Sequence, residues 1–172
     1  SALSIALSGL GHDVRIVMPR NYRIDRSKLE LVPGPMGVHC GYQEIWTGVY
    51  ESRLPDSDVP VYFIDHEESY GRDGVYGTAG ETDFNDNPQR FSLLAHAAFQ
   101  LCRKIRWIPD IVHAHDWASA LAPILLKFNE RHGDFARAAS VFTIHNIGYQ
   151  GVYSKHLFPY TGLGWDNFYA AG

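Results

Sequence analysis

The chain has 172 residues and a mass of 19.4 kDa, a length that suits one domain. Apolar residues make up 45% and charged residues 20%, an ordinary globular composition that excludes disorder as the main state. No apolar run reaches the roughly 18 residues that a membrane-spanning helix needs. The formal charge of −4 argues against a nucleic-acid partner, because phosphate backbones repel a negative surface.

The two cysteines, Cys40 and Cys102, are too few for a disulfide framework. Both lie in apolar stretches, so we expect buried free thiols, as in proteins of a reducing compartment. The chain begins without Met and without the basic segment of a signal peptide, and its first residues already have a helical pattern. We therefore expect it to be a fragment.

The first segments predict a helix followed by a strand. Residues 1–10 place leucines on one helical face, and Gly11 suits the position that ends a helix. Residues 13–18 form a short β-branched run before Pro19 and predict a buried strand. A helix, a glycine turn and a strand form one half of a βαβ unit whose first strand is missing.

The middle of the chain predicts strands, loops and one long helix. Residues 21–37 are polar and rich in Pro and Gly, which predicts a loop. Residues 44–54 and 59–65 are enriched in aromatic and β-branched side chains, which predicts strands. Residues 66–87 contain spaced glycines without an apolar period and predict a surface loop, whereas the apolar face of residues 88–107 predicts a helix.

A regular alternation follows. Residues 110–114 predict a strand, residues 117–130 a helix that Pro123 kinks, and residues 140–144 a second strand. Strands that alternate with helices indicate an α/β domain with a parallel sheet.

Candidate functional residues follow the two strands of this alternation. Asp116 comes after the first strand, and His145 and Asn146 come after the second. Ligands of open α/β sheets bind beyond the carboxyl ends of the strands, so we expect the three side chains to share one crevice. Asp116 also suits the N-cap of the next helix, and His145 with Asn146 also suits a simple turn.

Two histidines, His113 and His115, lie on the first of these strands and point to the same side of it. With Asp116 they could hold a metal ion, but further ligands are not evident nearby. The simpler interpretation is that one of them is a core residue bonded to backbone. No phosphate-binding glycine motif and no nucleophile elbow accompany them.

The 66–87 loop combines aromatic rings with Asn, Asp and Arg side chains. Sugars stack their apolar faces on aromatic rings and bond their hydroxyls to such polar groups. The alternative is a solvated loop in which Asp and Asn form turns. The candidate residues are Tyr70, Arg72, Tyr76, Asp83, Asn85, Asp86 and Asn87.

Six segments, in order along nearly the whole chain, carry a resemblance to a known family. They are GHDVRIVMPRN, VYFID, GVYG, DNPQRF, PDIVHAHDWASALAP and SVFTIHNIGYQG. The chain resembles the bacterial glycogen synthase and plant starch synthase family, and HAHDW and HNIGYQG are the most specific of its motifs. Many members have His after HAHDW, where this chain has Ala118.

The resemblance implies the GT-B architecture, in which two Rossmann-like domains enclose the active site. Residues 1–172 would be most of the N-terminal, acceptor-side domain, a parallel sheet with flanking helices that lacks its first strand. Such enzymes transfer glucose from ADP-glucose to the non-reducing end of an α-1,4-glucan, with retention of configuration and without a metal or cofactor. The implied partners are the glucan, ADP-glucose and the C-terminal domain of the same protein, in a bacterial cytoplasm or a plastid stroma.

The same resemblance implies roles for individual residues. Asp116 would bind hydroxyls of the transferred glucose, and His145 would lie near its reacting carbon, which makes these two the catalytic candidates. Substrate-binding roles are implied for Tyr76, Asn146, Tyr149 and Gln150. With only one well-placed carboxylate, same-face attack by the acceptor is favoured over a covalent double displacement.

Three alternatives remain open at this point. A metal-dependent hydrolase would use His113, His115 and Asp116 as ligands. A non-catalytic glucan-binding module would keep the aromatic loop but would not need His145. Another GT-B transferase, such as a sucrose synthase, would share the fold.

Overall fold

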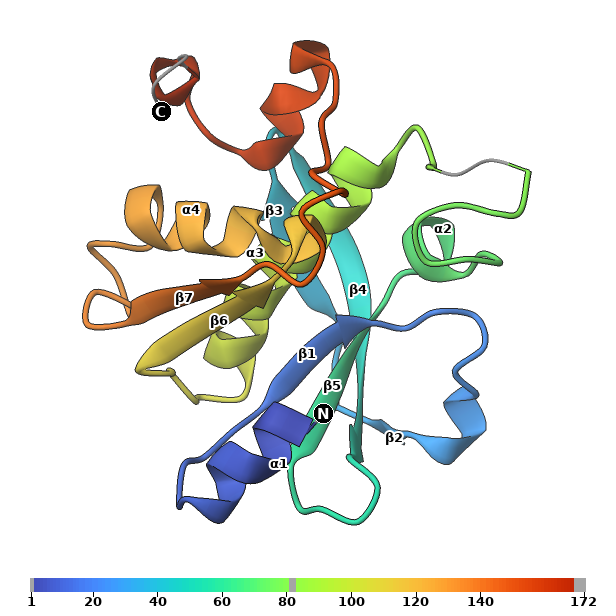
Figure 1. Cartoon of the computed structure of the whole chain (residues 1–172), viewed down its shortest axis with the longest axis vertical. Coiled ribbons are helices and arrows are strands. Elements are labelled where there is room, and N and C mark those ends of the chain that lie inside the picture. Colours follow the sequence, from blue (N-terminus) through green and yellow to red (C-terminus); the bar gives the residue numbers. More distant parts are fainter. Residues whose placement is uncertain (1, 81–82, 169–172) are drawn as a thin grey trace. The chain divides into compact units, whose positions relative to one another are not determined.

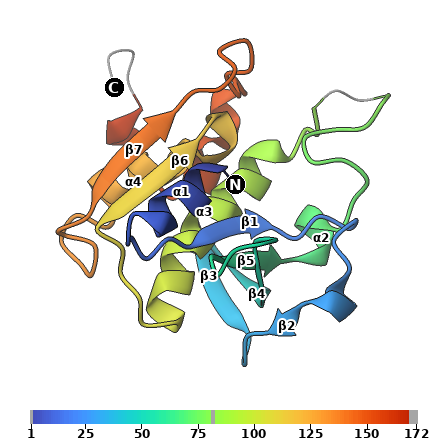
Figure 2. The same cartoon turned by 60° about the horizontal axis from the view of Figure 1, so that its bottom comes forward.

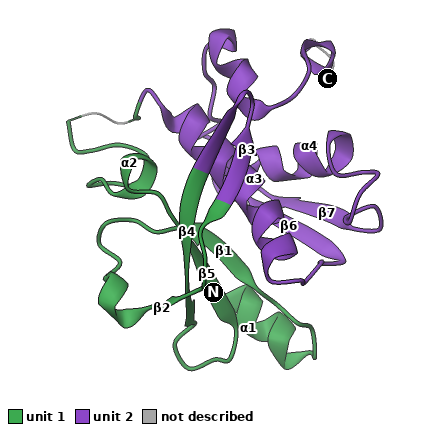
Figure 3. Ribbon diagram, turned by 180° about the vertical axis from the view of Figure 1, so that it is seen from behind, with its two compact units in different colours: residues 1–36, 46–84 green, residues 37–45, 85–172 purple. Residues whose placement is uncertain are grey.

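The computed structural model describes residues 2–80 and 83–168 (Figure 1). The contacts of the chain divide it into two compact units (Figure 3). Unit 1 comprises residues 1–36 and 46–84, and unit 2 comprises residues 37–45 and 85–172.

The described strands of the first half of the chain form a mixed sheet. β1 (Ile16–Pro19) pairs in parallel with β5 (Pro60–Asp65), and β4 (Gln43–Arg53) pairs antiparallel with both β5 and β2 (Glu30–Leu31). β3 (Met36–Cys40) also pairs with β4. The α/β class is confirmed. The alternation of strands and helices led us to expect a parallel sheet, but the sheet here contains both parallel and antiparallel pairs.

Unit 1 has an apolar core and a buried ion pair. Val49 and Ile64, from β4 and β5, are fully buried. The guanidinium of Arg20, which is 5% exposed, donates to Asp65 at 2.6 Å and to Glu67 at 2.8 Å, so the charge at the end of β1 is paired. Buried charges of this kind are tolerated only when they are paired and hydrogen-bonded.

The short elements of unit 1 differ in part from the predictions. α1 (Ala2–Gly9) is helical as expected, but none of its residues is buried. The loop predicted for 21–37 contains the 3₁₀ turn η1 (Arg26–Lys28), β2 and the start of β3. The loop predicted for 66–87 contains α2 (Glu67–Tyr70), which begins where the His66 ring accepts a hydrogen bond from the Ser69 N–H.

Unit 2 is built on a parallel strand pair. β6 (Ile111–His115) and β7 (Ala139–Thr143) run side by side, with His115 opposite Thr143 (Figure 2). The helix between them, α4 (Leu121–Phe128), packs on this pair, and α3 (Asn87–Lys104) packs on α4. This is the predicted strand–helix–strand alternation.

The core of unit 2 lies between its helices. It consists of Ala95, Phe99, Cys102, Ala122, Leu125, Leu126 and Phe135. The rings of Phe99 and Phe135 meet edge to face at 4.9 Å between centroids. Cys40 and Cys102 are buried free thiols, as predicted, and burial raises the pKa of Cys40 to about 12.

The helix predicted for residues 117–130 is two elements. A 3₁₀ turn, η2 (Trp117–Ser119), precedes α4, whose first residue is Leu121. Pro123 therefore lies in the first turn of α4, where the N–H groups have no partner inside the helix. The predicted kink at Pro123 was wrong for this reason. After β7 the chain forms two further 3₁₀ segments, η3 (Lys155–Thr161) and η4 (Trp165–Asn167).

Candidate active site

The carboxyl ends of β6 and β7 meet at one rim. The backbone N–H of Asp116 donates to the carbonyl oxygen of Thr143 at 2.9 Å, one residue beyond the last ladder pair. This bond places the segment after β6 directly beside the segment after β7. The predicted juxtaposition of Asp116, His145 and Asn146 is therefore what the structure shows.

The Asp116 carboxylate bonds across this rim. Its Oδ1 accepts the backbone N–H of His145 at 2.7 Å and that of Asn146 at 3.3 Å. These bonds, first of all the one from His145, lower the pKa of Asp116, since they stabilise its charged form. The group is an anion at neutral pH, fixed on one side by backbone and available on the other.

The N-cap interpretation of Asp116 was wrong. Asp116 precedes η2, but its side chain makes no capping bond to that turn, and its Oδ1 is instead bonded to the segment after β7. Its backbone has φ 55° and ψ 179°, a conformation that non-glycine residues rarely adopt. The strained backbone and the bonded carboxylate together hold Asp116 in one orientation.

Three imidazole rings form a row along the same rim. The ring of His115 stacks on that of His113 at 4.2 Å and lies nearly parallel to that of His145 at 5.3 Å between centroids. His115 Nδ1 and His145 Nε2 are 3.1 Å apart and share a hydrogen bond. His113 Nε2 bonds the Thr143 hydroxyl at 2.7 Å rather than a backbone group, which corrects the simpler interpretation of these histidines.

The segment after His145 is a compact turn. Asn146 Oδ1 accepts the N–H of Gly148 at 3.0 Å, and the N–H of Tyr149 donates to the Asn146 carbonyl oxygen at 3.2 Å. Gln150 closes the turn by donating its amide to the Ile147 carbonyl oxygen at 3.2 Å. The turn interpretation of Asn146 thus coexists with its position at the rim.

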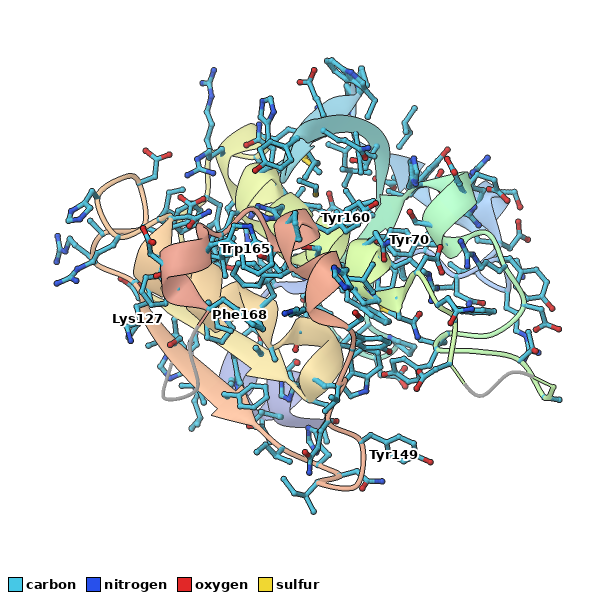
Figure 4. The ribbon with its side chains drawn as sticks, turned by 90° about the horizontal axis from the view of Figure 1, so that it is seen from above. Tyr70, Lys127, Tyr149, Tyr160, Trp165 and Phe168 are labelled. Carbon is cyan, nitrogen blue, oxygen red and sulfur yellow. The ribbon has the colours of Figure 1, made fainter. Side chains whose placement is uncertain are left out.

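Tyr149 is the exposed member of this turn. Its side chain is 69% exposed and projects away from the ribbon in Figure 4. A phenol in this position has one free apolar face and a polar tip, the combination that stacks on a sugar and bonds its hydroxyls. Its predicted binding role stays a prediction.

Trp117 and Ser119 support the rim, and the sequence analysis missed both. The Trp117 ring meets Phe91 edge to face at 4.9 Å and lies against Gly151, which anchors the turn to α3. Ser119 Oγ accepts the backbone N–H of His115 at 2.5 Å and donates to the His115 carbonyl oxygen at 2.7 Å. The serine two residues after the tryptophan in HAHDWAS was the available signal for this clamp.

Tyr76 belongs to unit 1, so the structure does not place it with the rim. Its ring is 44% exposed, and its carbonyl oxygen accepts the N–H of Phe84 at 2.8 Å. Two other members of the predicted sugar-contacting set are buried, Tyr70 at 1% and Asn87 at 0% exposure. Their predicted contact with a sugar was wrong, because neither side chain reaches the surface.

His113, His115 and Asp116 are the candidates for a metal site within the described residues, 2–80 and 83–168. Within these residues no group of three or more His, Cys, Asp or Glu side chains is arranged to hold a metal ion, and this includes His113, His115 and Asp116. Over the same ranges, no helix combines the length and apolar character needed to cross a membrane.

The rim thus presents an anionic oxygen beside a row of imidazoles. A carboxylate of this kind accepts hydrogen bonds from hydroxyl groups and stabilises positive charge that develops nearby. An imidazole beside it donates or accepts a single hydrogen bond according to its tautomer. The arrangement suits a hydroxyl-rich ligand that passes through a cationic state.

Comparison with known proteins gives one consistent result. The protein-family model of the starch synthase catalytic domain matches residues 1–172 of this chain. A glycogen synthase of Treponema denticola is 66% identical over 172 residues, which are 100% of this chain and 35% of that protein. Glycogen synthase 1 of Geobacter metallireducens is 43% identical over 94% of this chain and 33% of its own length.

A solved structure agrees. The catalytic domain of starch synthase IV from Arabidopsis thaliana, bound to ADP and acarbose, superimposes with a TM-score of 0.83 at 25% identity. The match covers 96% of this chain and 33% of that one, so the chain spans about a third of the relatives it matches. On this match over its whole length, the chain belongs to the glycogen synthase and starch synthase family.

Proposed function

We propose that this chain is the acceptor-side part of a retaining glucosyltransferase. The enzyme moves glucose from ADP-glucose to the non-reducing end of an α-1,4-glucan. Family membership supports glucan synthesis, and the Arabidopsis relative was solved with ADP and acarbose, a nucleotide and a glucan-like sugar. Because the chain spans about a third of its relatives, the remaining part of the enzyme is its obligatory partner.

The observation that carries this proposal is the Asp116–His145 rim. The Asp116 carboxylate accepts the His145 N–H at 2.7 Å, so the two residues are held side by side and would both face a sugar bound at the rim. The free side of Asp116 binds hydroxyls of the transferred glucose, and His145 lies against the reacting carbon. Both act by orientation and by electrostatic stabilisation of the transition state.

The residues of the rim favour one mechanism. Glycosyl transfer passes through an oxocarbenium-like state. Residues 113–119 and 143–151 contain a single carboxylate, Asp116, and its Oδ1 already accepts two backbone N–H groups, which stabilise it as an anion and make it a weaker nucleophile. Attack by the acceptor hydroxyl on the face that the phosphate leaves needs no protein nucleophile. The departing phosphate oxygen takes the acceptor's proton, so the transfer requires no cofactor.

A transfer assay on the complete protein tests this function. Radiolabelled glucose from ADP-glucose is followed into glycogen for the wild type and for Asp116→Asn and His145→Ala. We expect kcat to fall by roughly 10²–10³, the typical loss when one group that stabilises developing charge is removed. Far-UV circular dichroism checks that the variants are folded.

The matched control is His132→Ala, a histidine in the exposed turn after α4. It should keep wild-type turnover. Wild-type turnover in Asp116→Asn or His145→Ala would remove those residues from the mechanism. A wild-type protein that binds glucan but transfers no glucose would favour a binding module instead.

A further inference from the structure

His115 is the middle ring of the imidazole row. Its ring stacks on His113 at 4.2 Å on one side and bonds His145 at 3.1 Å on the other. His145 follows the end of β7, whereas His115 is the last residue of β6. A side chain on a strand thus contacts a ring that projects from a turn.

The bond between the two rings links their proton positions. A hydrogen bond between two imidazoles requires one N–H and one free lone pair. When Nδ1 of His115 carries its proton, Nε2 of His145 must be unprotonated, and the reverse arrangement holds equally. The tautomer of one ring therefore determines the tautomer of the other.

The His115 side of this pair is the rigid side. Its backbone is held by the ladder to Thr143 and by both bonds to Ser119. Its ring is supported by His113, which is in turn bonded to the Thr143 hydroxyl at 2.7 Å. His145 is held by its backbone N–H to Asp116, but the position of its ring depends on His115.

We propose that His115 is a positioning residue that holds the His145 ring and couples the proton position of that ring to its own. The proposal rests on the proposed function, in which His145 is the group at the reacting carbon. His115 itself does not touch the substrate. Its contribution is to hold the His145 ring in one orientation toward the sugar, with the two contacting nitrogens in complementary protonation states.

The groups around His115 favour its neutral form. Burial lowers the pKa of His115, and the neighbouring His113 and His145 rings lower it further, while Asp116 opposes them. A doubly protonated pair would place two N–H groups against each other and lose the bond. At neutral pH the ring of His115 is therefore in the state that can share one proton with His145.

Two substitutions separate this role from simple packing. His115→Phe keeps a flat ring for stacking on His113 but removes the nitrogen. His115→Asn loses the ring but keeps a hydrogen-bonding group near the position of Nδ1. A positioning role predicts that Asn preserves what Phe abolishes, whereas a packing role predicts the opposite order.

The first readout is the protonation state of the histidine nitrogens. Two-bond ¹H–¹⁵N spectra of the ¹⁵N-histidine-labelled chain distinguish protonated from unprotonated ring nitrogens. In the wild type we expect one protonated and one unprotonated nitrogen at the His115–His145 contact. The His145 signals should shift toward the averaged values of a free imidazole in His115→Phe and not in His115→Asn, with His132→Gln as the unaffected control. Identical His145 signals in the wild type and His115→Phe would overturn the proposal.

The second readout is turnover of the complete protein. We expect His115→Phe to lower kcat roughly 10- to 100-fold with little change in KM for the glucan, because misplacement of a catalytic group costs rate on this scale. His115→Asn should recover most of that loss. An unchanged kcat in His115→Phe would overturn the positioning role even if the nitrogen signals change. A wild-type protein without transferase activity would refute the proposed function alone, since the nitrogen signals still decide the link between the rings.

Discussion

Gly151 offers a test of how the two rim segments are packed together. Its φ is +62°, a left-handed conformation that favours glycine. A Cβ atom there would lie 2.5 Å from Cε3 and 2.8 Å from Cδ2 of Trp117. The substitution Gly151→Ala therefore meets both a backbone penalty and a steric clash.

The two contributions can be added. A non-glycine residue in the left-handed region costs about 1–2 kcal/mol. Overpacking a well-filled site costs about 1–3 kcal/mol, and Trp117 has little freedom to move because Phe91 contacts its ring at 4.9 Å. We expect Gly151→Ala to lower the free energy of unfolding by about 2–5 kcal/mol.

Urea unfolding followed by far-UV circular dichroism measures this change. The matched control is Gly133→Ala, in the same unit, where an added Cβ has no heavy atom nearer than 3.9 Å and φ is not left-handed. The control should stay within about 0.5 kcal/mol of the wild type. Equal stability of the two variants would refute the packing of Gly151 against Trp117.

Two further predictions concern stability. Phe135→Ala should lower the free energy of unfolding in urea by about 3–5 kcal/mol, as for other buried phenylalanines, because Phe135 is 1% exposed and packs edge to face on Phe99. Phe128→Ala, at a residue that is 43% exposed, should lower it much less. Equal losses in the two variants would contradict the assigned core. His96 donates Nε2–H to the Thr161 carbonyl oxygen at 2.8 Å, and burial lowers the pKa of His96 in the folded state. As the pH falls, the unfolded state therefore takes up the proton before the folded state does. The free energy of unfolding should fall as the pH drops below about 6.5, the ordinary pKa of histidine. Unfolding at pH 7.5 and 5.0 measures this loss, which should be smaller in His96→Gln; the same loss in the wild type and the variant would exclude His96 as its source.

The rim was predictable because its signals are local. β6 and β7 are short apolar runs separated by one helix, and parallel strands joined in this way end at the same edge. That geometry alone placed Asp116 near His145. The bond that joins them goes from a side chain to backbone, so no residue pattern showed whether Asp116 would cap η2 or bond the β7 side.

Other features depended on tertiary contacts that local patterns do not contain. β3 lies partly in a segment that is rich in glycine and proline, and its strand conformation comes from pairing with β4. Tyr70 and Asn87 belong to a segment whose composition is typical of a sugar-binding loop, yet both side chains are buried. Their burial follows from packing within each unit, which overrides the polar character of the segment.

The matched ladder of β6 and β7 determines which length changes this part of the chain can tolerate. The position of each rim residue depends on the register of the two strands, in which His115 lies opposite Thr143. Deleting one residue inside either strand would turn every later side chain to the opposite face and separate Asp116 from the His145 N–H. Insertions at the exposed residues 131–133, between α4 and the buried Phe135, leave that register untouched, so natural variants of this domain should differ in length there and keep both strands intact.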